Sequence, residues 1–119
     1  MPQQPTEPPL EIRQSGDVTV VQFTCPMLWG LQLVQAVGER LYRLVDEGQT
    51  RIVLNLQDVQ SMDSSMLGKL IGLHKKTEEA AGRLAICQFH PELYATFETL
   101  KLVRLLHIYP MEEEALRSF

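Results

Sequence analysis

Short apolar runs typical of buried strands alternate along this chain with segments of helical periodicity, and this alternation limits the possible folds more than any other feature. The clearest run, RIVLNLQDV at 51–59, is almost continuously apolar from Ile52 to Leu56. Such a run fits a strand that is covered on both faces and lies centrally in a sheet. A polar turn and a helical pattern over 67–82 follow it directly. We therefore expect an α/β domain built around strand 51–59.

The same periodicities predict the remaining elements. In chain order these are two strands within 10–23 joined by a turn at 15–17, a helix over 31–48, the strand at 51–59, a helix over 67–82, a strand at 83–89, a helix beginning at Pro91, a strand at 105–109 and a helix over 111–119. Strands that are separated by helices connect by right-handed crossovers into a largely parallel sheet. The order ββαβαβαβα thus predicts a mixed, mostly parallel sheet of five strands with four helices.

The expected core is drawn from the apolar positions of these elements. They are Val20, Leu41, Val53, Leu54, Leu56, Leu67, Leu70, Ile71, Leu84, Ile86, Leu93, Phe97 and Leu105. A chain of 119 residues holds one ordinary domain. Four of the first nine residues are proline, which disfavours helix and sheet alike, so we expect a tail at 1–9 and a single domain at 10–119.

Charge and hydrophobicity argue against several classes of function. The formal net charge is -4 and no cluster of Lys and Arg stands out, so nucleic acid is not an expected partner. No apolar run approaches the ~20 residues that span a bilayer, and the first residues lack the pattern of a signal peptide. We therefore expect a cytoplasmic protein that does not insert into membranes.

The cysteines and histidines do not form a recognisable motif. Cys25 and Cys87 lie far apart without a CxxC pattern, and His74, His90 and His107 are separated from one another. Neither set has the spacing of a zinc or redox site. We expect no metal site and no cofactor, with Cys87 buried as a small apolar residue.

The best candidate for a functional segment is the polar turn Met62-Asp63-Ser64-Ser65, which follows the central strand. Loops beyond the carboxyl ends of the strands carry the functional groups of open α/β sheets. Asp and Ser are also preferred helix N-caps, so the turn has a purely structural interpretation. The functional interpretation is that Ser64 presents a free hydroxyl at the positive end of the following helix, where a phosphate would be stabilised.

Two enzymatic motifs are missing from this turn. A hydrolase nucleophile elbow needs the pattern GxSxG, whereas the local sequence is MDSSM, and no His and acid are recognisably placed to activate the serine. The phosphate-binding pattern GxxxxGK followed by Ser or Thr is also absent. We therefore do not expect an enzyme, although a pocket with a histidine beside Ser64 would favour one.

The sequence from the central strand onward resembles the STAS domain of bacterial anti-sigma factor antagonists, and the likeness extends from about Leu10 to the end of the chain. The residues that carry it are Leu54-Asn55-Leu56, Met62-Asp63-Ser64-Ser65, Leu67-Gly68, Gly82, Pro91, Phe97 and Leu102. The resemblance implies a single STAS-like domain with helices mainly on one side of the sheet. It also implies that a partner-switching kinase phosphorylates the serine after the aspartate, here Ser64, with Asp63 as its acidic neighbour on the surface that faces the kinase.

Two positions depart from the usual pattern of the antagonists. Met66 stands where they commonly carry glycine after Asp-Ser-Ser, which places a flexible thioether beside Ser64. The segment 23–29 replaces a loop that often carries acidic residues, and it has none. This apolar segment either packs over the first helix or forms an exposed patch for another partner.

The leading hypothesis is a regulatory protein-interaction module, similar to an anti-sigma factor antagonist, that is controlled by phosphorylation of Ser64. Its partner would be an anti-sigma factor or a related serine kinase, which supplies ATP and magnesium. The expected partner-binding residues are Asp63, Ser64, Ser65 and Met66. The alternative is a scaffold of the same fold that is not phosphorylated, such as a subunit of a larger sensory or transport assembly. The sequence leaves the oligomeric state open.

Overall fold

The computed structural model describes residues 8–119, so residues 1–7 of the tail expected at 1–9 lie outside the described part of the chain. The main sheet contains β1 (Leu10–Ser15), β2 (Val18–Phe23), β4 (Arg51–Asn55), β6 (Arg83–Cys87) and β7 (His107–Tyr109). The helices are α1 (Leu31–Asp46), α2 (Ser64–Glu79), α3 (Pro91–Thr99), α4 (Glu112–Arg117) and the short 3-10 helix η1 (Leu102–Arg104). Two further strands, β3 (Met27–Leu28) and β5 (Ser61–Met62), pair with each other outside the main sheet.

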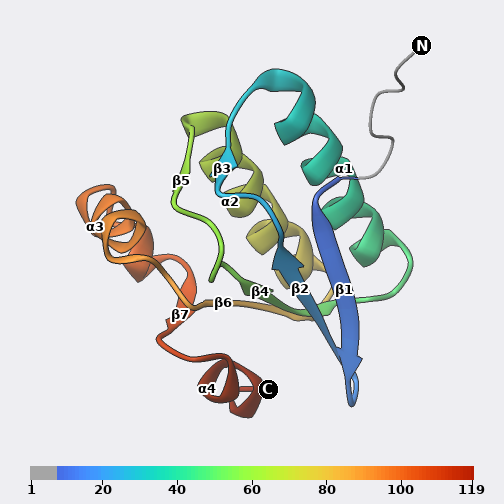
Figure 1. Ribbon diagram of the computed structural model, residues 1–119. Coiled ribbons are helices and arrows are strands. Elements are labelled where there is room, and N and C mark those ends of the chain that lie inside the picture. Colours follow the sequence, from blue (N-terminus) through green and yellow to red (C-terminus); the bar gives the residue numbers. More distant parts are fainter. Residues whose placement is uncertain (1–7) are drawn as a thin grey trace.

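The main sheet has the predicted architecture, with strand order β1-β2-β4-β6-β7 (Figure 1). β1 runs antiparallel to β2, and the pairs β2–β4, β4–β6 and β6–β7 are all parallel. The strand expected at the centre is β4, which has two strands on either side. Because β2, β4, β6 and β7 share one direction, the segments that follow them begin at one common edge of the sheet.

Alternate residues of the strands contribute to two separate apolar layers. Val21, Leu54 and Ile86 belong to the larger core, which also contains buried residues of α1, α2 and α3. Val53 and Ala85 face the other side, where they pack with Ala115 of α4. The expectation that the helices lie mainly on one side is therefore confirmed, and the remaining helix covers the opposite face.

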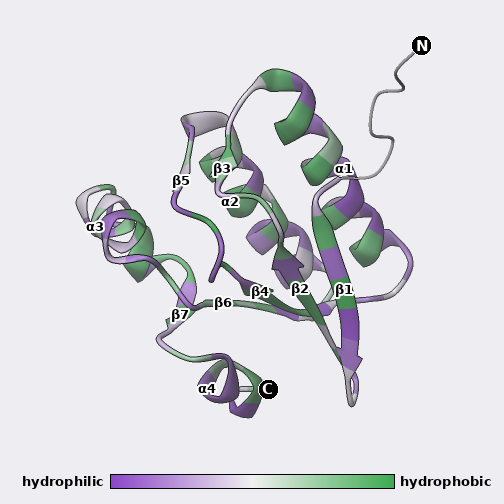
Figure 2. Cartoon of the chain, viewed as in Figure 1, coloured by the Kyte–Doolittle hydropathy of each residue, from purple (hydrophilic) through white to green (hydrophobic). Residues whose placement is uncertain are grey.

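The two long helices are amphipathic, as their sequences predict. Hydrophobic and hydrophilic residues alternate along α1 and α2 in Figure 2, and the buried positions of α1 include Val34, Val37 and Leu41. Gly48, just beyond α1, has a φ of 93°. Side chains other than glycine rarely adopt this left-handed conformation, so glycine suits the position just beyond the helix.

Most predicted core residues are buried, but Leu105 was assigned wrongly. Its side chain is 43% exposed, whereas Leu106 is only 5% exposed and belongs to the core. The difference arises because η1 precedes β7 and changes which side chain points inward. Ile71 is half-buried and packs against the edge of the core.

The helix boundaries differ from the predicted ones at two C-termini. α2 ends at Glu79, and the left-handed residue after it is Ala81 rather than Gly82. Glycine is needed at position 82 for close packing, because a Cβ there would lie 2.0 Å from the carbonyl oxygen of Thr50, the residue before β4. α4 occupies only Glu112–Arg117 of the predicted 111–119.

Candidate functional site

The turn that the sequence singled out lies at the carboxyl edge of the sheet, where α2 begins. Asp63 is the N-cap of this helix, and Oδ1 of its carboxylate accepts a hydrogen bond from the amide of Met66 at 3.0 Å. The other carboxylate oxygen, Oδ2, accepts a hydrogen bond from the amide of Gly30 at 3.0 Å. Gly30 is the N-cap of α1. One side chain therefore joins the starts of both long helices.

The electrostatic state of Asp63 follows from these two contacts. Hydrogen bonds from the amides of Gly30 and Met66 lower the pKa of the Asp63 carboxyl below its ordinary value, because both stabilise the charged form. Asp63 therefore stays ionised at neutral pH. Since both of its oxygens are already occupied by amides, its geometry is that of a positioning group rather than of a general base.

Ser64 and Ser65 are exposed at the first two positions of α2. Unpaired backbone N–H groups and the helix dipole make this end of a helix electropositive, and no acidic residue lies in the first turn of α2. A phosphate on Ser64 would therefore meet a favourable local field. Ser64 and Ser65 are thus exposed beside the half-buried Asp63.

Met66 is not on this surface. Its side chain is completely buried and belongs to the larger core. The expectation that it lies in a partner-binding surface is corrected, because the third residue of α2 points toward the sheet while Ser64 and Ser65 point away from it. Met66 instead contributes apolar packing beneath the turn.

The two-stranded ladder β3–β5 is a part of the site that sequence reasoning missed. Met27 is the register partner of Ser61, and Leu28 that of Met62. A further hydrogen bond continues this ladder: the amide of Asp63 donates to the carbonyl oxygen of Leu28 at 3.2 Å. The sequence carries no signal for it, because strands of two residues are too short for periodicity to identify.

The apolar segment 23–29 is partly buried and partly exposed. Leu28 is fully buried and belongs to the core that contains α1. Met27 and Trp29 on either side of it are 44% and 51% exposed. The segment is thus anchored by Phe23 and Leu28, and it exposes Met27 and Trp29 near the turn at Asp63.

A groove of about 410 Å³ lies next to the turn, between β5 and α3. Its lining residues are Gln60, Ser61, Met62, Glu92, Leu93 and Thr96, and they include no histidine. His74 lies ten residues beyond Ser64 on α2, about 15 Å away at the rise of an α-helix. Its ring is instead 5.9 Å from that of His107. The groove beside the turn therefore contains no histidine.

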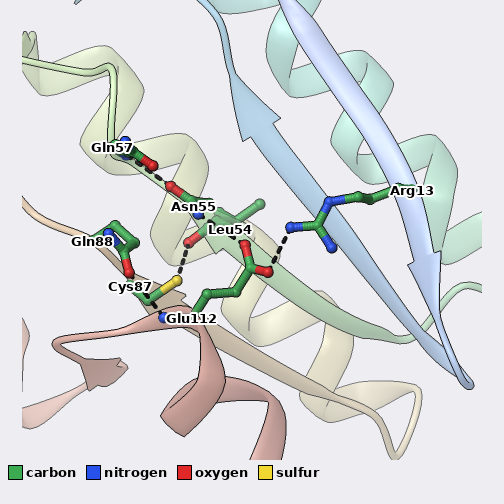
Figure 3. Close-up of polar contacts among 7 residues, drawn as sticks. All are labelled: Arg13, Leu54, Asn55, Gln57, Cys87, Gln88 and Glu112. Carbon is green, nitrogen blue, oxygen red and sulfur yellow. Dashed lines mark hydrogen bonds and ion pairs between the residues drawn. The ribbon is translucent and has the colours of Figure 1, made fainter.

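A polar network on the opposite face of the sheet holds α4 in place (Figure 3). The Glu112 carboxylate accepts hydrogen bonds from Arg13 at 2.5 Å and from Asn55 at 2.8 Å, and the Glu112 amide donates to the side chain of Gln88 at 3.0 Å. Burial by itself would raise the pKa of Glu112, but the bonds from Arg13 and Asn55 outweigh it and lower this pKa. The Cys87 thiol lies beneath the network, and burial raises its pKa to about 12.

Among residues 8–119, no group of three or more His, Cys, Asp or Glu side chains is arranged so that it could hold a metal ion. Within the same range, no helix has both the length and the hydrophobicity of a membrane span.

Known proteins with similar sequences and structures were identified. The family described as STAS domain matches residues 9–115. An anti-sigma F factor antagonist from Paenibacillus polymyxa is 35% identical over 65 residues, which are 55% of this chain and 56% of that protein. The aligned part thus spans little more than half the length of this relative.

Two solved structures have the same fold. An anti-sigma-factor antagonist (STAS) domain protein from Planctomyces limnophilus superposes with a TM-score of 0.80 at 20% identity, covering 92% of this chain and 96% of that one. The Bacillus cell fate determinant SpoIIAA in its phosphorylated form superposes with a TM-score of 0.69 at 22% identity, covering 92% and 97%. The family match extends over nearly all of the residues that form the sheet and its helices, and this chain belongs to the STAS domain family.

Proposed function

We propose that this protein is an anti-sigma factor antagonist that binds a serine-kinase anti-sigma factor and is released when the kinase phosphorylates Ser64. The observation that carries the proposal is the exposed Ser64 at the first position of α2, next to the N-cap Asp63. The relative from Paenibacillus polymyxa is named as an anti-sigma F factor antagonist, and SpoIIAA has been solved in a phosphorylated form. Both support the proposal.

In this mechanism the chain is a substrate and not a catalyst. The kinase supplies ATP and magnesium, and the Ser64 hydroxyl oxygen attacks the γ-phosphorus of ATP while ADP leaves. The hydroxyl proton passes to a base of the kinase. The proposal implies a cytoplasmic protein, because the nucleotide and the transcription machinery are located there.

The added phosphate changes the surface more than the fold. It carries about -1.5 to -2 charges, which takes the formal net charge from -4 to about -6. The positive end of α2 stabilises this charge within the domain. A partner surface that was complementary to the neutral serine then faces an unmatched dianion, so binding weakens while the domain remains folded.

The test uses purified serine-kinase anti-sigma factors with ATP and magnesium, followed by peptide mapping of the phosphorylated chain. We expect phosphate on Ser64, none on the Ser64→Ala variant, and normal incorporation into the matched Ser65→Ala variant. The phosphorylated protein should keep a cooperative thermal transition and lose affinity for the kinase. Phosphate on Ser65 would contradict the assignment of the site.

One observation favours the alternative of a scaffold that is not phosphorylated. The exposed Met27 and Trp29 offer a binding surface that needs no modification to function. In that case Ser64 only begins the helix, and a Ser64→Asp variant would bind the partner as tightly as the wild type.

A further inference from the structure

We infer that the partner meets this surface with an uncharged, apolar patch, and that Trp29 is the residue that anchors it. The inference rests on the proposed function and specifies the chemistry of the partner. The surface in question, called the apolar rim below, consists of Met27, Trp29 and Leu31. It is the part of segment 23–29 and the start of α1 that lies outside the core.

The apolar rim is unusually exposed for residues of its kind. Met27, Trp29 and Leu31 are 44%, 51% and 70% exposed, and all three lie within five consecutive residues. The remaining large apolar side chains that are exposed among residues 8–119 are scattered over α3, the segment up to β7, and the residue before α4. Single exposed apolar residues are normal in soluble proteins, whereas a cluster of this type marks a binding surface.

The apolar rim is fixed relative to Ser64. The β3–β5 ladder pairs Met27 with Ser61, three residues before the phosphorylation site. On the other side of Trp29, the amide of Gly30 donates to the Asp63 carboxylate, which also caps α2. Because these contacts lie on both sides of Trp29, they hold the apolar rim beside the turn with Ser64.

The segment that carries the apolar rim has no charged side chain. Residues 18–38 contain no Asp, Glu, Lys, Arg or His. The first turns of α1 and α2 contain no acidic residue either. The carboxylate of Asp63 already accepts two amide hydrogen bonds. A strongly basic or acidic partner surface would therefore find no counter-charge on the segment that carries the apolar rim and would lose hydration on contact, whereas an apolar partner surface would not.

A glycine near Ser64 is consistent with close approach of the partner. Gly68 lies one turn after Ser64 on the same side of α2. A Cβ at this position would meet no atom within 4 Å, so nothing in the fold requires glycine there. Glycine weakens an exposed helix, and a local feature that weakens the fold without a packing reason is expected at functional sites.

The apolar character also explains how phosphorylation could act on binding. An apolar contact excludes water from its surroundings, and a charge that is trapped at its margin without a counter-ion is costly. A phosphate on Ser64 would be such a charge. Release would then result from loss of hydration of the phosphate rather than from repulsion between two charged surfaces.

The experiment uses the kinase that phosphorylates Ser64 in the test above and measures its affinity for unphosphorylated variants. Trp29 is the only tryptophan of the chain. Its fluorescence therefore reports directly on the apolar rim when the kinase used has no tryptophan at the interface. We expect the emission of Trp29 to shift to shorter wavelength on binding. Trp29→Ala should weaken binding by about thirtyfold, as for other aromatic anchors, and Trp29→Phe should recover part of the loss.

Leu105→Ala is the matched control, because Leu105 is also exposed but precedes β7 at the opposite edge of the sheet. It should leave the affinity within about threefold of the wild type. The affinity should also change by less than about threefold between about 50 and 500 mM salt, since no charged contacts contribute to it. Thermal transitions of all variants verify that they are folded.

The outcomes separate this inference from the proposed function. If no serine-kinase anti-sigma factor phosphorylates Ser64, the proposed function fails and the inference fails with it. If Ser64 is phosphorylated but Trp29→Ala binds as tightly as the wild type, or high salt abolishes binding, only the inference is overturned. A third outcome is that the protein forms a dimer that Trp29→Ala disrupts, while the variant binds the kinase normally. That result would assign the apolar rim to contact with a second copy of the chain, and it would also overturn the inference.

Discussion

Asp63 shows how much a single residue contributes to this site. Its carboxylate caps α2 through Met66 and holds the start of α1 through Gly30. The sequence predicted the cap, because Asp before a helical pattern is a known signal. It could not predict the contact with Gly30, since that residue lies 33 positions away in the chain. The burial of Met66 was also missed, because a residue in the first turn of a helix can face either way.

We expect Asp63→Asn to lower stability at neutral pH, because one carboxylate oxygen is replaced by an NH2 group that cannot accept an amide hydrogen bond. The folded state lowers the pKa of Asp63. Its carboxylate therefore stabilises the fold above the unfolded pKa of about 3.9, and this contribution is lost as the pH falls through the folded pKa.

The gap in urea midpoint between the wild type and Asp63→Asn should accordingly be largest near neutral pH and should narrow below about pH 4. Asp58→Asn removes the same charge from an exposed position and serves as the control. A gap that stays constant down to about pH 3 would mean that the carboxylate charge is not what holds the two helices.

The elements themselves were largely predictable from periodicity. The five strands of the main sheet and the four α-helices are all present in the expected order. The short ladder β3–β5 and the 3-10 helix η1 were not predicted, because elements of two or three residues have no measurable period. The position of α4 on the far face depends on contacts from Arg13 and Asn55, which no local pattern encodes.

The network around Glu112 should control how firmly α4 is docked. A hydrogen bond to a charged group contributes about 1.5–3 kcal/mol, so Glu112→Ala should make opening of α4 at least about tenfold more frequent. Opening uncovers Cys87, whose thiol is otherwise buried. In a Cys25→Ser background, labelling of Cys87 by a thiol reagent should accelerate by a similar factor.

Glu113→Ala is the control for this measurement. Glu113 lies in the same helix, but its side chain is 86% exposed and its contact with Arg117 is 4.0 Å long. It should leave the labelling rate nearly unchanged. Equal acceleration in both variants would indicate that the network does not hold the helix.

At the scale of the whole molecule, the sheet separates a larger core under α1, α2 and α3 from a smaller one under α4. The site lies entirely at the carboxyl edge, above the larger core. This arrangement follows from the parallel direction of four strands, which the alternation of strands and helices in the sequence predicts. The fold was thus more predictable than the surface, because burial follows from periodicity, whereas contacts between distant loops do not.

Leu54 tests the central packing. It is fully buried in the middle strand of the sheet, so Leu54→Ala should cost about 2–5 kcal/mol in the free energy of unfolding. Leu105→Ala, at an exposed leucine, should change it by less than about 0.5 kcal/mol. Denaturant titrations, fitted with the same dependence of the free energy on denaturant concentration, measure the stability of both variants. Equal midpoints for the two variants would contradict the central placement of Leu54.

The position of β1 at the outer edge of the sheet has a consequence for aggregation. Unpaired strand edges are templates for association between chains, and proteins protect them with charges or short strands. The exposed Glu11 and Arg13 lie on β1, and β7 at the other edge has only three residues. The apolar sequence most able to form fibrils, in β4, has a paired strand on each side. Fibril growth should therefore require the domain to unfold first.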